Sequence, residues 1–179
     1  MPVIEPTAWV PQPWRNGAGV THELVRWPKA DPFAIRISVA DVTAPAPFST
    51  FPGYTRWLYL LDGGPVTLAI DGDDTVLAAA GDGVVFAGDA SVAATAVARP
   101  SRDLNVMVST TLTARCEILR GCPNMGSDPI TGHAVFAISG EVTVQGSVLG
   151  RHGCVWAIDE RVRVELAAGA IAAILVVER

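Results

Sequence analysis

Short runs of alternating apolar and polar residues, separated by glycine and proline turns, dominate this chain. The alternation is plainest in residues 162–166, and it recurs in residues 33–42 and 66–70, with a turn at residues 71–74. Residues 134–138 and 171–177 are almost entirely apolar. A period of two predicts half-buried strands, and short apolar runs of this length predict fully buried ones. Because no long stretch has a convincing helical period, the pattern predicts an all-β sandwich or barrel.

A longer pattern occurs twice along the chain. Each copy has an apolar strand, a glycine turn, a second strand and a third strand led by glycine; one begins at Arg56 and the other at His133. The aligned positions are Arg56–His133, Gly63–Gly140, Gly83–Gly153, Phe86–Trp156 and Asp89–Asp159. Such a repeat predicts two similar β-barrels within one chain.

The repeat also predicts how the chain is organised. We expect one compact unit over residues 1–179, with a first barrel over residues 33–108 and a second over residues 109–179. Residues 1–32 belong to neither repeat and carry three tryptophans, so we expect them to pack across both barrels. Residues 121–132 are expected to form the loop between the halves.

The order of strands and turns resembles the cupin barrel, which normally holds a metal with two His, a Glu and a further His. In the first repeat the corresponding positions are Ser49, Phe51, Arg56 and Ser91. Hydroxyls, a phenyl ring and a guanidinium are poor ligands for zinc or iron, so no metal and no other cofactor is expected. A cation in place of the acidic ligand favours an anion at this site.

Composition narrows the choice of partners. The chain has 179 residues, half of them hydrophobic, with 17% charged residues and a formal net charge of −5. Without a basic cluster, nucleic acids and acidic membrane surfaces are not expected as partners. Cys116, Cys122 and Cys154 have no zinc-like or redox spacing, and no secretion signal or membrane span is recognisable. A soluble cytoplasmic protein is therefore expected.

Two arginines are the main candidates for recognising an anion. Arg56 comes directly before an apolar strand, and if it faces inward it requires an acid. That acid is either a ligand or Asp103, in which case the two residues form a buried structural pair. Arg36 and Ser38 alternate with apolar residues. They face either a cavity or the solvent, and this strand alone favours the solvent.

The segment of residues 14–24, WRNGAGVTHEL, combines two glycines with polar groups. It fits either a turn that plugs a barrel or part of a binding pocket, and it is not a phosphate-binding loop. His133 has no second metal-ligating side chain at a suitable spacing. No nucleophile motif is present, and Glu23 and Asp103 are the only evident candidates for a base. No catalytic residue is therefore assigned.

Four segments together resemble the HutD/Ves family. WRNGAGVT, RISVADV, FSTFPGYTR and DLNVM follow one another between Trp14 and Met107, although Arg15 and Ala18 stand where Lys and Gly are usual in that family. The resemblance implies a bicupin without the usual metal, from a group of bacterial proteins found with histidine-utilisation genes. It also implies the pocket residues Trp14, Asn16, Gly17, Thr21, Arg36, Ser38, Ser49, Phe51, Arg56, Asp103 and Asn105.

The function expected from the residues and the resemblance is the binding of a small carboxylate, with urocanate or formylglutamate as ligand, in the modulation of histidine catabolism. Two alternatives stay open. One is an isomerase or hydrolase acting on a similar acid, and the other is a structural or partner-binding protein with no ligand. A second copy of the chain, forming a homodimer, is a further candidate partner.

Overall fold

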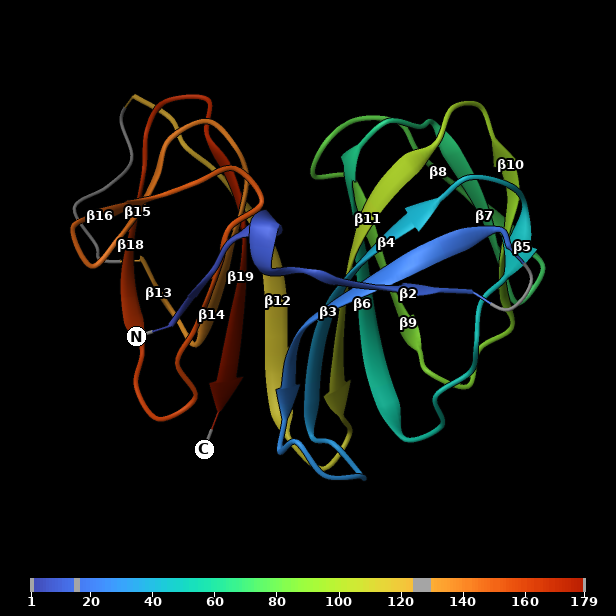
Figure 1. Cartoon of the computed structure of the whole chain (residues 1–179), viewed down its shortest axis with the longest axis horizontal. Coiled ribbons are helices and arrows are strands. Elements are labelled where there is room, and N and C mark those ends of the chain that lie inside the picture. Colours follow the sequence, from blue (N-terminus) through green and yellow to red (C-terminus); the bar gives the residue numbers. More distant parts are fainter. Residues whose placement is uncertain (1, 15–16, 124–129, 179) are drawn as a thin grey trace. The chain divides into compact units, whose positions relative to one another are not determined.

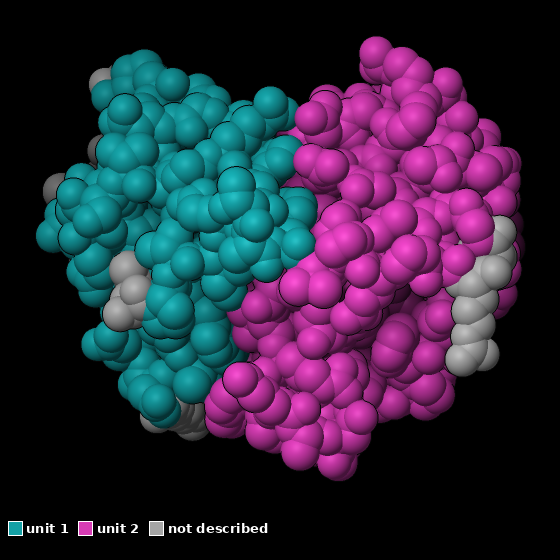
Figure 2. Space-filling view, viewed as in Figure 1, with its two compact units in different colours: residues 1–9, 112–179 teal, residues 10–111 magenta. Residues whose placement is uncertain are grey.

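The computed structural model describes residues 2–14, 17–123 and 130–178. Within these ranges the regular secondary structure is all β-strand apart from one 3₁₀ turn, η1 (Pro6–Ala8), so the predicted all-β fold is confirmed. The chain divides into two compact units, here called the first barrel (residues 10–111) and the second barrel (residues 1–9 and 112–179) (Figure 2). No helix in the described part of the chain is long and apolar enough to cross a membrane.

The first barrel consists of two antiparallel sheets (Figure 1). In spatial order, the six-stranded sheet contains β2 (Val10–Pro13), β3 (Gly19–Trp27), β4 (Ile35–Val42), β11 (Ser101–Ser109), β6 (Tyr54–Asp62) and β9 (Gly83–Ala87). The four-stranded sheet contains β5 (Ala46–Pro47), β10 (Val92–Val97), β7 (Val66–Ile70) and β8 (Asp73–Leu77). Buried residues of both sheets, including Leu58 and Leu68, form one apolar cluster, so the sheets face each other across this core.

The second barrel has the same arrangement. One sheet contains β1 (Val3–Ile4), β17 (Cys154–Trp156), β14 (Ala134–Ser139), β19 (Ile171–Glu178) and β12 (Thr113–Arg120). The other contains β13 (Ile130–Gly132), β18 (Val162–Leu166), β15 (Val142–Val144) and β16 (Ser147–Leu149). The order β12-β19-β14-β17 corresponds to β4-β11-β6-β9, and β13-β18-β15-β16 corresponds to β5-β10-β7-β8. The predicted duplication is therefore confirmed strand by strand.

The register of the strands refines the predicted alignment. Leu58 pairs with Asn105 in the first barrel and Val135 with Ile174 in the second, which keeps Arg56 equivalent to His133. The third strand is shifted by one residue from the sequence alignment. Leu60 N–H donates to the Asp82 carbonyl, and Ala137 N–H donates to the Gly153 carbonyl. The alignments of Gly83 with Gly153 and of Phe86 with Trp156 are therefore wrong, because the turns before these strands differ in length.

The predicted organisation differs from the structure in four places. Residues 10–32 supply β2 and β3 to the first barrel, whereas β1 pairs with β17 in the second barrel. The boundary between the barrels follows Thr111, three residues later than expected. Residues 130–132, expected in a loop, form β13, and residues 73–74, expected in a turn, begin β8. That residues 1–179 form a single compact unit stays a prediction.

Candidate binding pocket in the first barrel

A cavity of about 530 Å³ opens inside the first barrel, between β3, β4, β6 and β11 and the segment around Phe48. Its wall contains most of the residues predicted for the pocket: Trp14, Thr21, Arg36, Ser38, Ser49, Phe51, Arg56 and Asn105. Gly17 is exposed and lies outside the wall, and Asp103 is not part of it. Asn16, also predicted for this site, lies outside the described residues.

Strand alternation directs the polar residues of β4 into this cavity. Arg36, Ser38 and Ala40 line it, and Ser38 is only 1% exposed. The preference for a solvated face, drawn from this strand alone, is therefore wrong for Arg36 and Ser38. A period of two separates the two faces of a strand but does not identify the one that faces the core.

Arg56 is the most unusual residue of the wall, because its side chain is only 3% exposed. It faces inward from the start of β6, paired with Met107 on β11 and Phe86 on β9. Its Nη1 donates a hydrogen bond of 2.8 Å to the Ser49 carbonyl, and its Nε is buried without a hydrogen-bond partner. The guanidinium lies 5.5 Å from the centre of the Phe51 ring, close enough for a cation–π contact.

The pKa of Arg56 is lowered to about 10, first by burial and then by the positive charge of Arg36. Arg36 is better compensated, because its Nε donates to Glu23 Oε2 at 2.7 Å. Glu23 also lies 3.6 Å from Arg26, which pairs in turn with Asp31. The described cavity wall therefore holds two guanidiniums, those of Arg36 and Arg56, and no carboxylate. Arg36 pairs with Glu23, whereas Arg56 has no acidic partner in the described salt bridges.

The rest of the wall is largely apolar and aromatic. Trp14 is held by a 2.7 Å hydrogen bond from its Nε1 to Thr21 Oγ1, and its ring meets Phe48 edge to face at 6.0 Å. Leu58 and Met107 complete the apolar surface. A fixed indole in the same cavity as a cation suits a small ligand with a flat apolar body and an acidic end.

The Arg56–Asp103 pair, one of the two alternatives for Arg56, is absent from the described salt bridges. Asp103 pairs in register with Leu60, which lies about 13 Å along the strand from Arg56 at roughly 3.3 Å per residue. Asp103 is fully buried and accepts a hydrogen bond from Ser101, while its Oδ1 has no partner. Burial raises its pKa to about 7, aided by Asp41 and opposed by the Ser101 hydrogen bond. The distance along the sequence between Arg56 and Asp103 does not reveal the register of β6 with β11. The sequence therefore could not show whether these two side chains meet.

The other positions expected to replace cupin ligands are only partly brought together. Ser49 and Phe51 line the cavity beside Arg56, whereas Ser91 does not and instead donates its backbone N–H to Asp71. In the second barrel, His133 occupies the position of Arg56, and its Nδ1 accepts a 3.0 Å hydrogen bond from the Val177 backbone N–H. Within the described ranges, no group of three or more His, Cys, Asp or Glu residues is placed to hold a metal.

Sequence reasoning missed several contributors to the site, among them Glu23 and Met107. Glu23 was noted as a polar group or base but not as the partner of Arg36, and Met107 was not assigned to the wall. Both follow from strand alternation once β3 and β11 are known. The sequence gives little signal for β3, because residues 21–23 are all polar and Gly19 stands at its start.

Two duplicated antiparallel barrels with a cavity in one of them define a bicupin. The model of the HutD family matches residues 7–175, and this chain belongs to that family.

Similar proteins come from several bacteria. An uncharacterized 21.2 kDa protein in the hutC 3′ region of Pseudomonas putida is 32% identical over 142 residues, covering 78% of this chain and 73% of the relative. Protein Ves of Citrobacter koseri is 38% identical over 134 residues, covering 71% and 67%. The solved structure of HutD from Pseudomonas fluorescens SBW25, in its formate condition, has a TM-score of 0.82 and 26% identity over 99% of both chains.

Proposed function

We propose that this chain binds a small carboxylate in the cavity of the first barrel and does so without catalysing its conversion. The observation that carries the proposal is the buried guanidinium of Arg56 in the cavity wall, whose Nε has no hydrogen-bond partner. The described wall contains a second arginine, Arg36, and no carboxylate. Burying a cation without a counter-ion is costly, and an acidic ligand removes most of that cost.

The geometry of a guanidinium suits this role. Its planar fork matches the two oxygens of a carboxylate, and a charge-assisted hydrogen bond contributes about 1.5–3 kcal/mol. The Phe51 and Phe86 rings, at 5.5 and 5.0 Å from the Arg56 guanidinium, limit the freedom of its side chain. The absence of a carboxylate from the described wall also deprives a bound acid of an obvious general base, which supports binding over turnover.

We further propose that the ligand is an acid of histidine breakdown, urocanate or formylglutamate, and that binding lets the protein modulate this pathway. Support comes from the family: one relative is described as a protein in the hutC 3′ region, and a solved relative is HutD itself. A cavity of about 530 Å³ is large enough for either acid.

Calorimetry and thermal-shift measurements with urocanate and formylglutamate test this proposal. We expect one of them to bind and to raise the melting temperature, because a ligand specific to the native state stabilises it. Product analysis after prolonged incubation should detect no conversion. Conversion of either acid would favour the enzyme alternative, and a lack of binding by both acids would contradict the proposal.

The variant Arg56→Met tests the site itself. Methionine keeps the apolar stem and removes the fork, so affinity should fall by about tenfold or more. Arg163→Met is the matched control, since Arg163 is exposed on β18 of the second barrel and pairs only with Glu165 in the described ion pairs. Unchanged affinity in Arg56→Met, or an equal loss in Arg163→Met, would overturn the assignment of the site.

A further inference from the structure

We propose that Asn105 and Ser38 form a second subsite in the same cavity, which selects acids carrying a neutral N–H group in addition to the carboxylate. This inference rests on the proposed function, because it assumes that the carboxylate binds at Arg56. It adds a structural reason for the choice of acid, because the patch distinguishes amide- or azole-bearing acids from acids that carry no N–H.

The side chain of Asn105 is the main observation. It is only 8% exposed and lines the cavity, yet its Oδ1 is buried with no hydrogen-bond partner among the described residues. Buried polar side-chain atoms are normally paired, and one left unpaired costs stability. A carboxamide at the wall of a binding cavity is therefore well suited to a partner supplied by the ligand.

Ser38 stands directly beside this carboxamide. Ser38 on β4 pairs in register with Asn105 on β11, and Ser38 is 1% exposed and lines the cavity. The neighbouring wall residues Ala40, Leu58 and Met107 are apolar and offer no side-chain hydrogen bond. The hydroxyl and the carboxamide thus form a small uncharged patch that can both donate and accept.

The patch lies at a defined distance from the cation. Asn105 is paired with Leu58, and Arg56 lies two positions earlier on the same face of β6. Two residues along a strand span about 7 Å. A ligand that reaches both groups has its carboxylate at one end and its neutral polar group roughly that far away, with the apolar body between them against Trp14 and Phe48.

The expected consequence is selectivity against acids that lack the N–H. A site built around a buried polar group rejects an analogue that leaves the group unpaired more strongly than an apolar pocket rejects a change of size. Asn105 should therefore matter for the choice between acids more than for the binding of carboxylates in general.

Matched ligand pairs test this inference by calorimetry on the full chain at a pH where imidazole is neutral. Urocanate is compared with 3-(2-furyl)acrylate, whose furan has no N–H, and formylglutamate with its N-methyl derivative. In the wild type, the acid with the N–H should bind about 10- to 100-fold more tightly. In Asn105→Leu, which keeps the shape and removes the carboxamide, this ratio should fall to near one.

Several outcomes would decide between the possibilities. If no acid of either pair binds the wild type, the proposed function fails and this inference with it. If acids bind but the ratio is near one in the wild type, or is unchanged in Asn105→Leu, the inference alone is overturned. If Asn105→Leu fails to fold, Ser38→Ala serves as the second variant and must lower the ratio, with Ser147→Ala in the second barrel as its control.

Discussion

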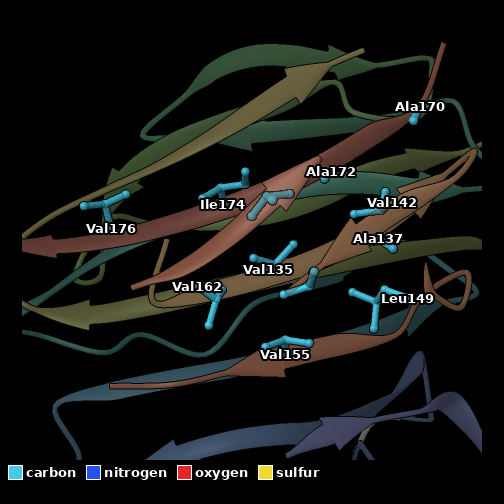
Figure 3. Close-up of a cluster of buried hydrophobic side chains, with 12 residues drawn as sticks. Val135, Ala137, Val142, Leu149, Val155, Val162, Ala170, Ala172, Ile174 and Val176 are labelled. Atoms are coloured by element: carbon cyan, nitrogen blue, oxygen red, sulfur yellow. The ribbon is translucent and has the colours of Figure 1, made fainter. Parts of the chain in front are cut away.

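The two barrels share a topology but differ in what fills them. In the second barrel, the interior is a continuous aliphatic cluster that includes Val135, Ala172 and Ile174 (Figure 3). In the first barrel, the positions equivalent to Ala172 and Ile174 are Asp103 and Asn105, by the register with β6 and β14. One copy of the fold is thus packed for stability, and the other retains polar groups and an open cavity.

This difference illustrates how a duplicated fold can divide its tasks. Burying aliphatic side chains contributes about 25 cal/mol per Å² removed from water, whereas unpaired polar groups oppose folding. A barrel with buried Arg56, Asp103 and Asn105 is therefore less well optimised for stability than its neighbour in sequence. A local loss of stability of this kind is typical of binding sites.

The largest loss of stability is expected when a residue of the second barrel is replaced by the residue type found at the equivalent position of the first. Ala172→Asp places a carboxylate in a fully buried aliphatic cluster, and it should lower the free energy of unfolding by more than about 3 kcal/mol. The reverse change, Asp103→Ala, should cost much less, because Asp103 already has an unpartnered Oδ1. Chemical denaturation of both variants measures the difference, and equal costs would mean that the two interiors are not distinct.

The glycine turns after β6 and β14 should respond alike if the duplication is structural. Gly63 and Gly140 have φ of +77° and +71°, and a Cβ on Gly63 would lie 1.9 Å from the Pro100 carbonyl oxygen. On Gly140 it would lie 2.6 Å from the Ala170 Cα. Gly63→Ala and Gly140→Ala should each cost about 2 kcal/mol or more in denaturation experiments. A neutral result in one barrel alone would show that its turn can relax.

Arg36 and Arg115 occupy equivalent positions in the two barrels, but their substitution should affect stability differently. Arg36 pairs with Met107, and Arg115 pairs with Val176 at the equivalent place in the second barrel. Arg36 is 12% exposed and bound to Glu23, so Arg36→Met should destabilise the protein by about 1–2 kcal/mol. Arg115 is 55% exposed, and Arg115→Met should change stability by less than about 0.5 kcal/mol. Similar melting temperatures for the two variants would contradict this distinction.

The last prediction concerns pH. Burial raises the pKa of Asp103 to about 7 in the native state, from its ordinary value of 3.8. The native state therefore holds this proton more tightly, and the associated stability is present below about pH 4 and lost as the pH rises through about 7. The melting temperature of the wild type should fall relative to Asp103→Asn between about pH 5 and pH 8. Glu165→Gln, an exposed change in the second barrel, should leave the wild-type trend in place.

Strand positions could be read from the sequence where apolar and polar residues alternate without interruption. Residues 66–70 and 162–166 are strands as expected. The strand β3 was not recognised, because it begins at a glycine and its register shifts between Glu23 and Val25. Local pattern identifies an extended segment, but a bulge breaks the period on which that identification depends.

The site was harder to infer than the fold. The likeness of residues 49–56 to a cupin motif led to Ser49, Phe51 and Arg56, which do line one cavity. Asp103 was one of the two acids considered as the partner of Arg56, the other being a ligand. Its place at another level of the barrel depends on the register of β6 with β11, which composition and spacing do not encode.

The division of the chain also bears on the order in which the protein is made. The first barrel occupies the continuous residues 10–111, whereas the second needs β1, near the N-terminus, to pair with β17. Domains generally fold as units during synthesis, and those translated first have the opportunity to fold first. The cavity-bearing barrel can therefore form on the ribosome while β1 still lacks its partner strand, and the second barrel is completed only after β19 has been synthesised.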